Sequence, residues 1–463
     1  MEPNFNAVFW VTLVLTLALV RYNRVQEAAA RKPAETTSEE STSDARSFES
    51  FRSRYLVVYL LMVAGDWLQG PYVYSLYSAY GFSKEEISQL FVVGFGASMV
   101  FGTFIGSMAD SLGRKKFCLL YCALYVASCL TKHVNDYSVL MLGRLLGGTA
   151  TSLLFSVFES WLVCAHNSRG FGEERLGAMF SLSILGNSVV AIASGLLAQA
   201  AADAVPITGG PLLFVGGNTA PFDLASIVLV IGGCVLALTW EENYGERQAS
   251  AFSSAALVAS IGVLRKNPSV LALGLVQSLF EGAMYSFVFE WTPALTKEEG
   301  STLPYGTIFA TFMVCCMAGS QLVPMVLARY SPQQALPAVF IVSAVALAAV
   351  PLDDVLGGAL AFYGFLVFEL CVGLYFPLMG MLKSQVVPEQ HRSTLYNLFR
   401  VPLNVIVLVV LLRDFSVPFT FALCVALLLA AAALTVFAAH RLRVDAGAVA
   451  VKGPDEDEMQ PLN

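Results

Sequence analysis

The chain alternates long apolar segments with short polar ones over most of its 463 residues. A helix that crosses a bilayer takes about 20 apolar residues, and these segments are of that length. The longest polar break, residues 241–267, divides them into two blocks of six, which predicts an all-α membrane protein. The twelve predicted spans are 55–80, 86–109, 115–131, 138–164, 174–200, 221–240, 268–294, 304–328, 335–352, 357–382, 393–412 and 417–439.

A further apolar segment precedes the first block, at about residues 5–20, and Arg21 and Arg24 follow it directly. Basic residues on that side predict a retained anchor helix whose N-terminus points out of the cytosol. A cleaved signal peptide is the alternative, although residues 1–4 lack its positively charged start. The polar composition of the next segment is typical of disorder. The predicted parts are an anchor helix (1–21), a disordered cytosolic linker (22–54), a six-helix bundle (55–240), a cytosolic loop (241–267), a second six-helix bundle (268–440) and an acidic cytosolic tail (441–463).

Composition supports this topology. Hydrophobic residues make up 56% of the chain and charged residues 13%, whereas soluble proteins carry about 25% charged residues. The mean hydropathy is +0.67. Alternating the spans leaves most lysines and arginines on the cytosolic side, as the positive-inside rule requires. The outer side keeps only Lys84, Lys132, Lys297 and Arg413. No basic patch indicates nucleic acid.

Several kinds of chemistry have no signature here. The nine cysteines lie in or beside predicted spans, where we expect them to act as small apolar filler. No cysteine or histidine has metal-ligand spacing. The sequence contains no phosphate-binding P-loop, no His-Glu-x-x-His pair and no Gly-x-Ser-x-Gly nucleophile elbow. We therefore expect no metal, no cofactor and no enzyme activity. We also expect the protein to function as a monomer in the lipid bilayer.

The short turn between the second and third spans is the most specific motif. It contains Gly106, Asp110, Gly113, Arg114 and Lys115. Gly113 supplies backbone freedom for a tight turn, and Gly106 predicts close helix packing one turn earlier. The spacing resembles the loop between helices two and three of the major facilitator superfamily, with a departure at Ser111, where that family usually has a basic residue. We expect this turn to act in gating.

Polar side chains within two spans predict a cavity, because charge in lipid is costly and marks function. The fourth span carries a stripe at helical spacing, in which Arg144 is the cation. The alternative is a structural ion pair between Arg144 and Asp66. In the eleventh span, Arg400 offers a fork of donors that suits a tetrahedral oxyanion, although its neighbours also fit a helix–helix hydrogen-bond network. The two stripes are Arg144, Gly148, Ser152, Phe155, Ser156 and Glu159, and Tyr396, Asn397, Arg400 and Asn404.

Carboxyl groups form a third set. The first span contains Asp66, Gln69, Tyr72 and Tyr74 around Gly70-Pro71, which predicts a kink. The seventh span carries Gln277, Glu281 and Tyr285 as a stripe, with Glu290 further along, and Glu369 lies midway along the tenth span. Such groups serve proton coupling or cavity electrostatics, or form salt bridges that lock helices together. Both interpretations stay open.

Five runs in order along residues 55 to about 440 resemble the eukaryotic molybdate-anion transporter family of the major facilitator superfamily. They are 66–72 (DWLQGPY), 142–161, 289–293 (FEWTP), 373–377 (GLYFP) and 397–403 (NLFRVPL). Members of that family begin with an extra N-terminal helix, as this chain does. The resemblance implies a major facilitator fold and uptake of molybdate, a tetrahedral dianion, across the plasma membrane.

Arg144 and Arg400 belong to opposite blocks, so both could reach a central cavity. The other predicted substrate-binding residues are Asn397, Asn404, Tyr396, Ser152, Gln69 and Tyr72. The acids Asp66, Glu159, Glu281, Glu290 and Glu369 must then be protonated, paired or distant. We expect secondary active transport by rocking of the two blocks, with the Asp110–Lys115 turn as a latch. The alternatives are a transporter of another small anion or a proton-coupled solute, on a plasma or internal membrane, and a receptor or scaffold that does not transport.

Overall fold

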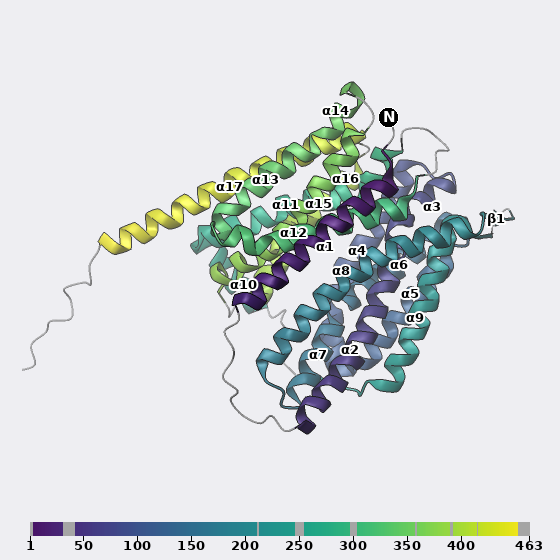
Figure 1. Ribbon diagram of the computed structural model, residues 1–463, viewed down its shortest axis with the longest axis horizontal. Helices are drawn as coiled ribbons and strands as arrows, with labels where there is room; N and C mark the ends of the chain where they lie inside the picture. The colour runs from purple at the N-terminus through teal and green to yellow at the C-terminus, as the bar shows by residue number, and fades with distance from the viewer. Residues whose placement is uncertain are drawn as a thin grey trace, which may run out of the picture. The chain divides into compact units, whose positions relative to one another are not determined.

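The computed structural model describes residues 3–30, 42–210, 213–245, 254–296, 303–356, 359–388, 392–413 and 415–451. Nearly all of it is helical (Figure 1). The chain forms two compact units, which are described separately. Unit 1 contains Met1–Ser250, Trp291–Ala318 and Val410–Asp414, and unit 2 contains Ala251–Glu290, Gly319–Val409 and Phe415–Asn463. The segment Trp291–Ala318 of the second predicted bundle therefore clusters with the first bundle.

Unit 1 holds the helices of the first half of the chain. Two short strands, β1 (Thr208–Gly209) and β2 (Phe214–Val215), pair antiparallel before its last helix. The other elements are α1 (Phe5–Ala30), α2 (Thr42–Trp67), η1 (Gly70–Tyr72), α3 (Val73–Ala79), α4 (Lys84–Leu112), α5 (Arg114–Thr131), α6 (Tyr137–Leu154), α7 (Val157–Asn167), α8 (Glu173–Ala204), η2 (Gly217–Thr219) and α9 (Ala220–Thr239).

Unit 2 is entirely helical in the residues described. Three of its helices also contribute residues to unit 1: α11 and α12 through Trp291–Ala318, and α16 through its last residues, 410–412. The elements are α10 (Ser254–Lys266), α11 (Pro268–Leu295), α12 (Tyr305–Leu327), α13 (Pro332–Leu347), α14 (Ala349–Leu356), α15 (Leu360–Val386), α16 (Arg392–Leu412) and α17 (Val417–Val451).

Each of the twelve predicted spans falls on a described helix or pair of helices. Ten described helical segments, including Phe5–Gln26 of α1, are long and apolar enough to cross a membrane, and the bent α4 would make eleven. The remaining two predicted spans are helices with a shorter apolar stretch. Three basic residues open α5, and the apolar part of α16 is only Leu398–Leu412.

Among the described residues three predicted spans are divided between two helices, and the sequence predicted one of these breaks; the ninth span divides at Ala348, between α13 and α14. The Gly70-Pro71 kink is confirmed, because α2 ends at Trp67 and a turn of 3₁₀ helix precedes α3. The fourth span also breaks, between Leu154 and Val157, so its stripe from Arg144 to Glu159 is not one continuous helical face. Ser156 donates its hydroxyl to the Ser152 carbonyl at 2.7 Å. Such side-chain bonds compete with the helical ladder and favour a bend.

The predicted linker and tail are more helical than expected. Residues 22–30 continue α1 and residues 42–54 begin α2, while the rest of the predicted linker lies outside the described residues. The α17 backbone stays helical to Val451, and the acidic residues 455–458 lie outside the described residues. Apolar residues at helical spacing explain the α1 extension only in part, and we have no physical account of the extension of α17.

An aromatic core holds together the end of unit 1 that carries the Asp110–Lys115 turn. The Trp161 and Trp240 rings stack at 3.7 Å, and Tyr55 stacks on Trp240 at 5.7 Å. All three side chains are buried. Aromatic pairs of this kind contribute about 0.5–1.5 kcal/mol each beyond their buried area.

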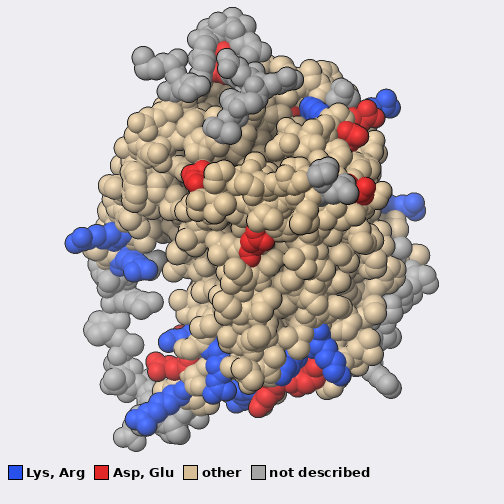
Figure 2. Space-filling model, turned by 90° about the vertical axis from the view of Figure 1, so that its right-hand side faces the viewer, with Lys and Arg blue, Asp and Glu red and all other residues tan. Residues whose placement is uncertain are grey.

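Figure 2 shows that Lys, Arg, Asp and Glu side chains gather at one end of the face in view, below a broad band where charges are few.

The N-terminal helix α1 packs within unit 1. Phe9 is 2% exposed and forms a small apolar cluster with Ala310 and Val314 of α12. Leu13 of α1 and Ile192 of α8 pack against this cluster. Much of the rest of α1 is exposed and apolar, as for Trp10 and Leu15, and a face of this kind suits lipid contact.

Candidate functional site

The turn between α4 and α5 is held by an ion pair. Arg114 Nε lies 2.7 Å from Asp110 Oδ1, and the Arg114 side chain is 11% exposed. Gly113 has φ +114°, a conformation that side chains disfavour. A Cβ at Gly113 would also lie 2.7 Å from the Glu242 carboxylate. The predicted need for glycine at this turn is therefore confirmed.

The close helix approach predicted at Gly106 is not seen. A Cβ added there would meet no described atom within 4 Å. A small residue instead allows close packing further along the same helix, at Gly94, where a Cβ would lie 2.5 Å from the Arg144 guanidinium.

A segment that sequence analysis missed, Glu241–Gly245, binds this turn directly after α9. Glu242 accepts hydrogen bonds from the backbone N–H groups of Lys115 at 2.7 Å and Lys116 at 3.3 Å. Those N–H groups belong to the first turn of α5, which has no intrahelical acceptor for them. The Asp110 carbonyl accepts from the Gly245 N–H at 2.9 Å. We call Glu241–Gly245 the strap; the signal for it was a run of acids directly after the sixth span.

The strap is also tied to the aromatic core. Asn243 Nδ2 donates to the Trp161 carbonyl at 3.0 Å, and Trp161 Nε1 donates to the Glu241 carbonyl at 2.9 Å. The exposed Glu241 carboxylate pairs with Arg169 at 3.1 Å. The contacts shown for the turn therefore join α4, α5, α7 and the strap, all of them in unit 1.

The polar residues near the α2 kink have partners within unit 1. Tyr125 donates its hydroxyl to the Asp66 carboxylate. Gln69 is buried and donates to the Gly65 carbonyl at 2.8 Å. Tyr72, which is 2% exposed, donates to Gln199 Oε1 at 3.0 Å. In this conformation the polar groups of Gln69 and Tyr72 are therefore occupied by hydrogen bonds within unit 1.

Arg144 lies against α4. Its Nε donates to the Leu90 carbonyl at 3.2 Å, and its guanidinium lies 4.5 Å from the centre of the Phe91 ring. Among the ion pairs of the described residues, none joins Arg144 to Asp66, so the structural pair considered above is not formed. Ser152 donates to its own helix at Thr149, and Glu159 of α7 is exposed.

Gln199 of α8 links three elements of unit 1. Its Oε1 also accepts the Gly306 N–H at 2.9 Å, at the start of α12. The two helices touch there, since a Cβ on Gly195 would lie 2.7 Å from the Gly306 carbonyl. By the predicted topology this contact lies at the outer side, opposite the Asp110–Lys115 turn.

Unit 2 contains a polar cluster on α11, α15 and α16. Glu281 accepts a hydrogen bond from Tyr375 at 3.1 Å, and Gln277 lies one helical turn before it on α11. Arg400 is exposed, and its charge acts on Glu281 and on Lys383. Lys383 Nζ lies 4.7 Å from the centre of the Tyr396 ring. Glu281, Lys383 and Arg400 are thus near enough for their charges to interact, although none of the ion pairs of the described residues joins Glu281 to either cation.

Lys383 was missed as a site residue, because its position at the end of the tenth span identified it only as a cytosolic basic residue. The other predicted residues of unit 2 lie elsewhere or are less defined. Glu290 and Glu369 are buried, at 1% and 6% exposure. Asn404 is half-buried, and the side chain of Asn397 lies outside what the structure describes.

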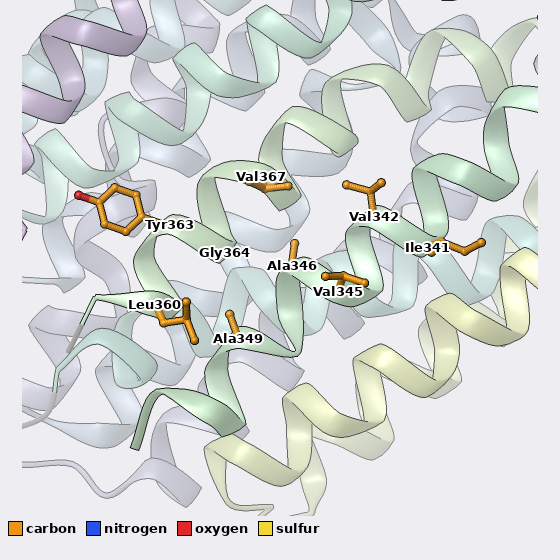
Figure 3. A pocket seen from close by; sticks show the side chains of 9 residues that line it. All are labelled: Ile341, Val342, Val345, Ala346, Ala349, Leu360, Tyr363, Gly364 and Val367. Carbon is orange, nitrogen blue, oxygen red and sulfur yellow. The ribbon is translucent and has the colours of Figure 1, made fainter. Parts of the chain in front are cut away.

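A groove of about 350 Å³ lies between α13 and α15 in unit 2 (Figure 3). Figure 3 shows Val345, Val367 and Leu360 among its apolar lining, and Tyr363 supplies the one hydroxyl of the labelled side chains. A surface of this chemistry cannot satisfy an oxyanion. Among the described residues no group of three or more His, Cys, Asp or Glu could hold a metal ion.

Comparison with known proteins gives three findings. A family model described as sugar transporters with 12 transmembrane helices matches residues 24–370. A molybdate-anion transporter of Xenopus tropicalis is 36% identical over 369 residues, covering 78% of each chain, and one of Danio rerio is 31% identical, covering 86% of this chain and 83% of its own.

Solved structures share the fold at low identity. The nucleoside transporter NupG superposes with a TM-score of 0.65 at 12% identity, over 84% of this chain and 99% of its own. A D-xylose–proton symporter gives 0.64 at 13% identity, over 83% of this chain and 96% of its own. These likenesses bear on fold alone.

Proposed function

The chain belongs to the molybdate-anion transporter family of the major facilitator superfamily, and we propose that it takes up molybdate by secondary active transport. Membership of this family assigns it to multi-pass membrane transporters and not to enzymes. The names of the relatives support molybdate as the substrate. We propose that this uptake takes place at the plasma membrane.

The observation that carries the substrate class is the exposure of Arg400 within the span formed by α16. An uncompensated guanidinium in lipid is costly, so an exposed arginine in a span calls for a water-filled cavity or an anion. Its planar fork of donors matches two oxygens of a tetrahedral oxyanion. Tyr396, one helical turn earlier, adds a hydroxyl on the same face.

Arg144 is the second proposed contact, from the other six-helix block. Its guanidinium is half-buried and held by one carbonyl, Leu90, and the face of Phe91. A single carbonyl leaves most of the five donors of an arginine for another acceptor. We propose that Arg144 keeps this packing and offers its remaining donors to an oxyanion, with the Ser152 hydroxyl two helical turns further along α6.

We propose alternating access as the mechanism. The contact of Gly195 with Gly306, with Gln199 bridging to Tyr72, joins α8 of the first block to α12 of the second. In transporters built from two repeated bundles, contacts at one side break when that side opens. We assign this contact to the outer gate, and we propose that the Asp110–Lys115 turn, which the strap holds fixed within the first block, acts in gating at the inner side.

Transport by purified protein in liposomes tests the proposal. Labelled molybdate should accumulate, and tungstate, an oxyanion of the same shape and charge, should compete. Stronger competition by sulfate than by tungstate would favour a transporter of another oxyanion. Absence of flux for any tetrahedral oxyanion would favour a receptor or scaffold.

A further inference from the structure

The cluster in unit 2 contains a carboxylate in addition to the two cations that suit an oxyanion. The charges of Lys383 and Arg400 interact with the single carboxylate of Glu281, at separations longer than those of the ion pairs found among the described residues. With all three groups ionised the cluster has a net charge of +1. When a dianion binds to the two cations, its two negative charges come close to the negative charge of Glu281. In a site of low dielectric such like charges repel strongly.

Packing places the two cations on the same face of the cluster. Lys383 Nζ lies over the Tyr396 ring at 4.7 Å, and Tyr396 and Arg400 are four residues apart on α16, which puts them on one side of the helix. Lys383 is half-buried and Arg400 is exposed. Ser278 of α11 donates to the Phe399 carbonyl at 2.7 Å, which fixes α11, with Glu281, against this part of α16.

Glu281 is surrounded by groups that fit either of its protonation states. Tyr375 donates to Oε1, a bond that a carboxylate and a carboxylic acid both accept. Gln277 is 6% exposed, and its Oε1 accepts no hydrogen bond from the described residues. A buried amide oxygen without a donor is costly, and a protonated Glu281 would supply that donor. Tyr285 on α11 is the remaining titratable group that acts on Glu281 among those described.

We propose that Glu281 is the exchangeable counter-ion of Lys383 and Arg400, displaced by the oxyanion and protonated as the oxyanion binds. This inference rests on the proposed function. Glu281 takes one proton from the water on the side to which the site is open, and its new O–H donates to Gln277. The cluster then has a net charge of +2, which matches a dianion. On release the proton leaves, and the Glu281 carboxylate again balances one of the two positive charges.

The consequence is obligatory coupling. If the oxyanion favours protonation of Glu281, then protonation favours the oxyanion by the same factor. Uptake of one proton per oxyanion makes the dissociation constant fall by up to about tenfold for each unit by which the pH falls. One proton and a dianion together carry a net charge of −1, so a pH gradient directed into the cell drives accumulation of the anion by up to about tenfold per pH unit when there is no opposing membrane potential.

Equilibrium binding of molybdate to the purified protein tests this, between about pH 6 and pH 8, where molybdate stays a dianion and lysine and arginine stay charged. Wild type should bind more tightly as the pH falls. Glu281→Gln, which mimics the protonated side chain, should bind with the low-pH affinity of wild type at every pH. Glu85→Gln, on the exposed start of α4, is the matched control and should keep the wild-type slope.

Calorimetry in two buffers of different ionisation enthalpy gives a second readout. Wild type should take up a proton as molybdate binds, and Glu281→Gln should not. In liposomes Glu281→Gln should still exchange molybdate for molybdate, while a pH gradient no longer drives accumulation. A Glu281→Gln protein that is monodisperse and keeps the wild-type pH slope overturns the proposal, and so does one that has lost binding.

Lys383 provides an independent arm. Lys383→Gln should weaken molybdate binding by about tenfold or more, as expected for a charge-assisted hydrogen bond, and Lys383→Arg should restore most of it. Lys266→Gln, at the exposed end of α10, is the control. Wild-type affinity in Lys383→Gln removes Lys383 from the shared pair and overturns the inference. If wild type binds no molybdate, the proposed function itself fails, which is a distinct result.

Discussion

Glu242 caps the first turn of α5 by accepting the Lys115 backbone N–H at 2.7 Å, across 127 residues of sequence. A carboxylate at a helix N-terminus is stabilised both by these hydrogen bonds and by the helix dipole. The cap joins the end of the first block to its second and third helices. It makes the Asp110–Lys115 turn part of a fixed network in unit 1.

Removing this cap should cost stability. We expect Glu242→Ala to lower the free energy of unfolding by about 1–2 kcal/mol, because two N–H groups lose their acceptor. Thermal unfolding in detergent measures the loss. Glu241→Ala is the matched control, since the Glu241 side chain is 84% exposed and exposed pairs contribute about 0–1 kcal/mol. Equal losses in the two variants would contradict the assignment of Glu242 as the cap.

The two glycines of the turn should differ in their tolerance of a side chain. Gly113→Ala places a Cβ against Glu242 at φ +114°, so we expect a loss of about 1–3 kcal/mol. Gly106→Ala meets open space within α4, where alanine favours the helix by about 1 kcal/mol. Unfolding curves of the two variants should therefore shift in opposite directions. A loss of stability in Gly106→Ala would show a contact that the described residues lack.

The Asp110–Arg114 pair should affect the rate of the cycle more than the affinity. Asp110→Asn removes one charge at the turn and leaves the cluster around Arg400 unchanged. We expect slower molybdate uptake, with binding within about twofold of wild type, because an interaction at a gate changes the barrier and not the site. Equal loss of uptake and binding would argue against a gating role for this turn.

The outer contact should tolerate no side chain at Gly306. Gly306→Leu would meet the carbonyl of Gly195 and the backbone of Gln199, so closure at this point becomes impossible. We expect uptake to fall by about tenfold or more while binding from the outer side persists. Gly380→Leu in α15, where a Cβ meets no described atom within 4 Å, should transport normally. Normal uptake by Gly306→Leu would remove this contact from the gate.

Much of the fold could be predicted because membrane-length apolar segments and charge bias are local signals. The Gly113 turn and the Gly70-Pro71 break were predictable for the same reason, since each depends on the backbone properties of one or two residues. The break at Phe155 was not, because nothing in an apolar run with two serines decides between a straight helix and one that bends. The hydroxyl bond of Ser156 becomes visible only with coordinates.

The site was predicted less completely. The sequence predicted Arg400 and Glu281 as site residues because isolated charges in apolar helices are conspicuous, and their roles stay predictions. It missed Lys383 and Glu242, which lie at helix ends where charges are ordinary, and whose partners depend on how α15 packs near α16 and how the strap returns to α5. The location of the protein in the plasma membrane and the joint action of Arg144 and Arg400 stay predictions.

Equilibrium binding of molybdate to wild type, Arg400→Gln and Arg144→Gln, with Arg265→Gln at the exposed end of α10 as the control, tests the central claim most directly. Loss of a charge-assisted bond to a dianion should weaken binding by about tenfold or more in each of the two site variants. The control should bind as wild type does. Wild-type affinity in both Arg400→Gln and Arg144→Gln would contradict the account.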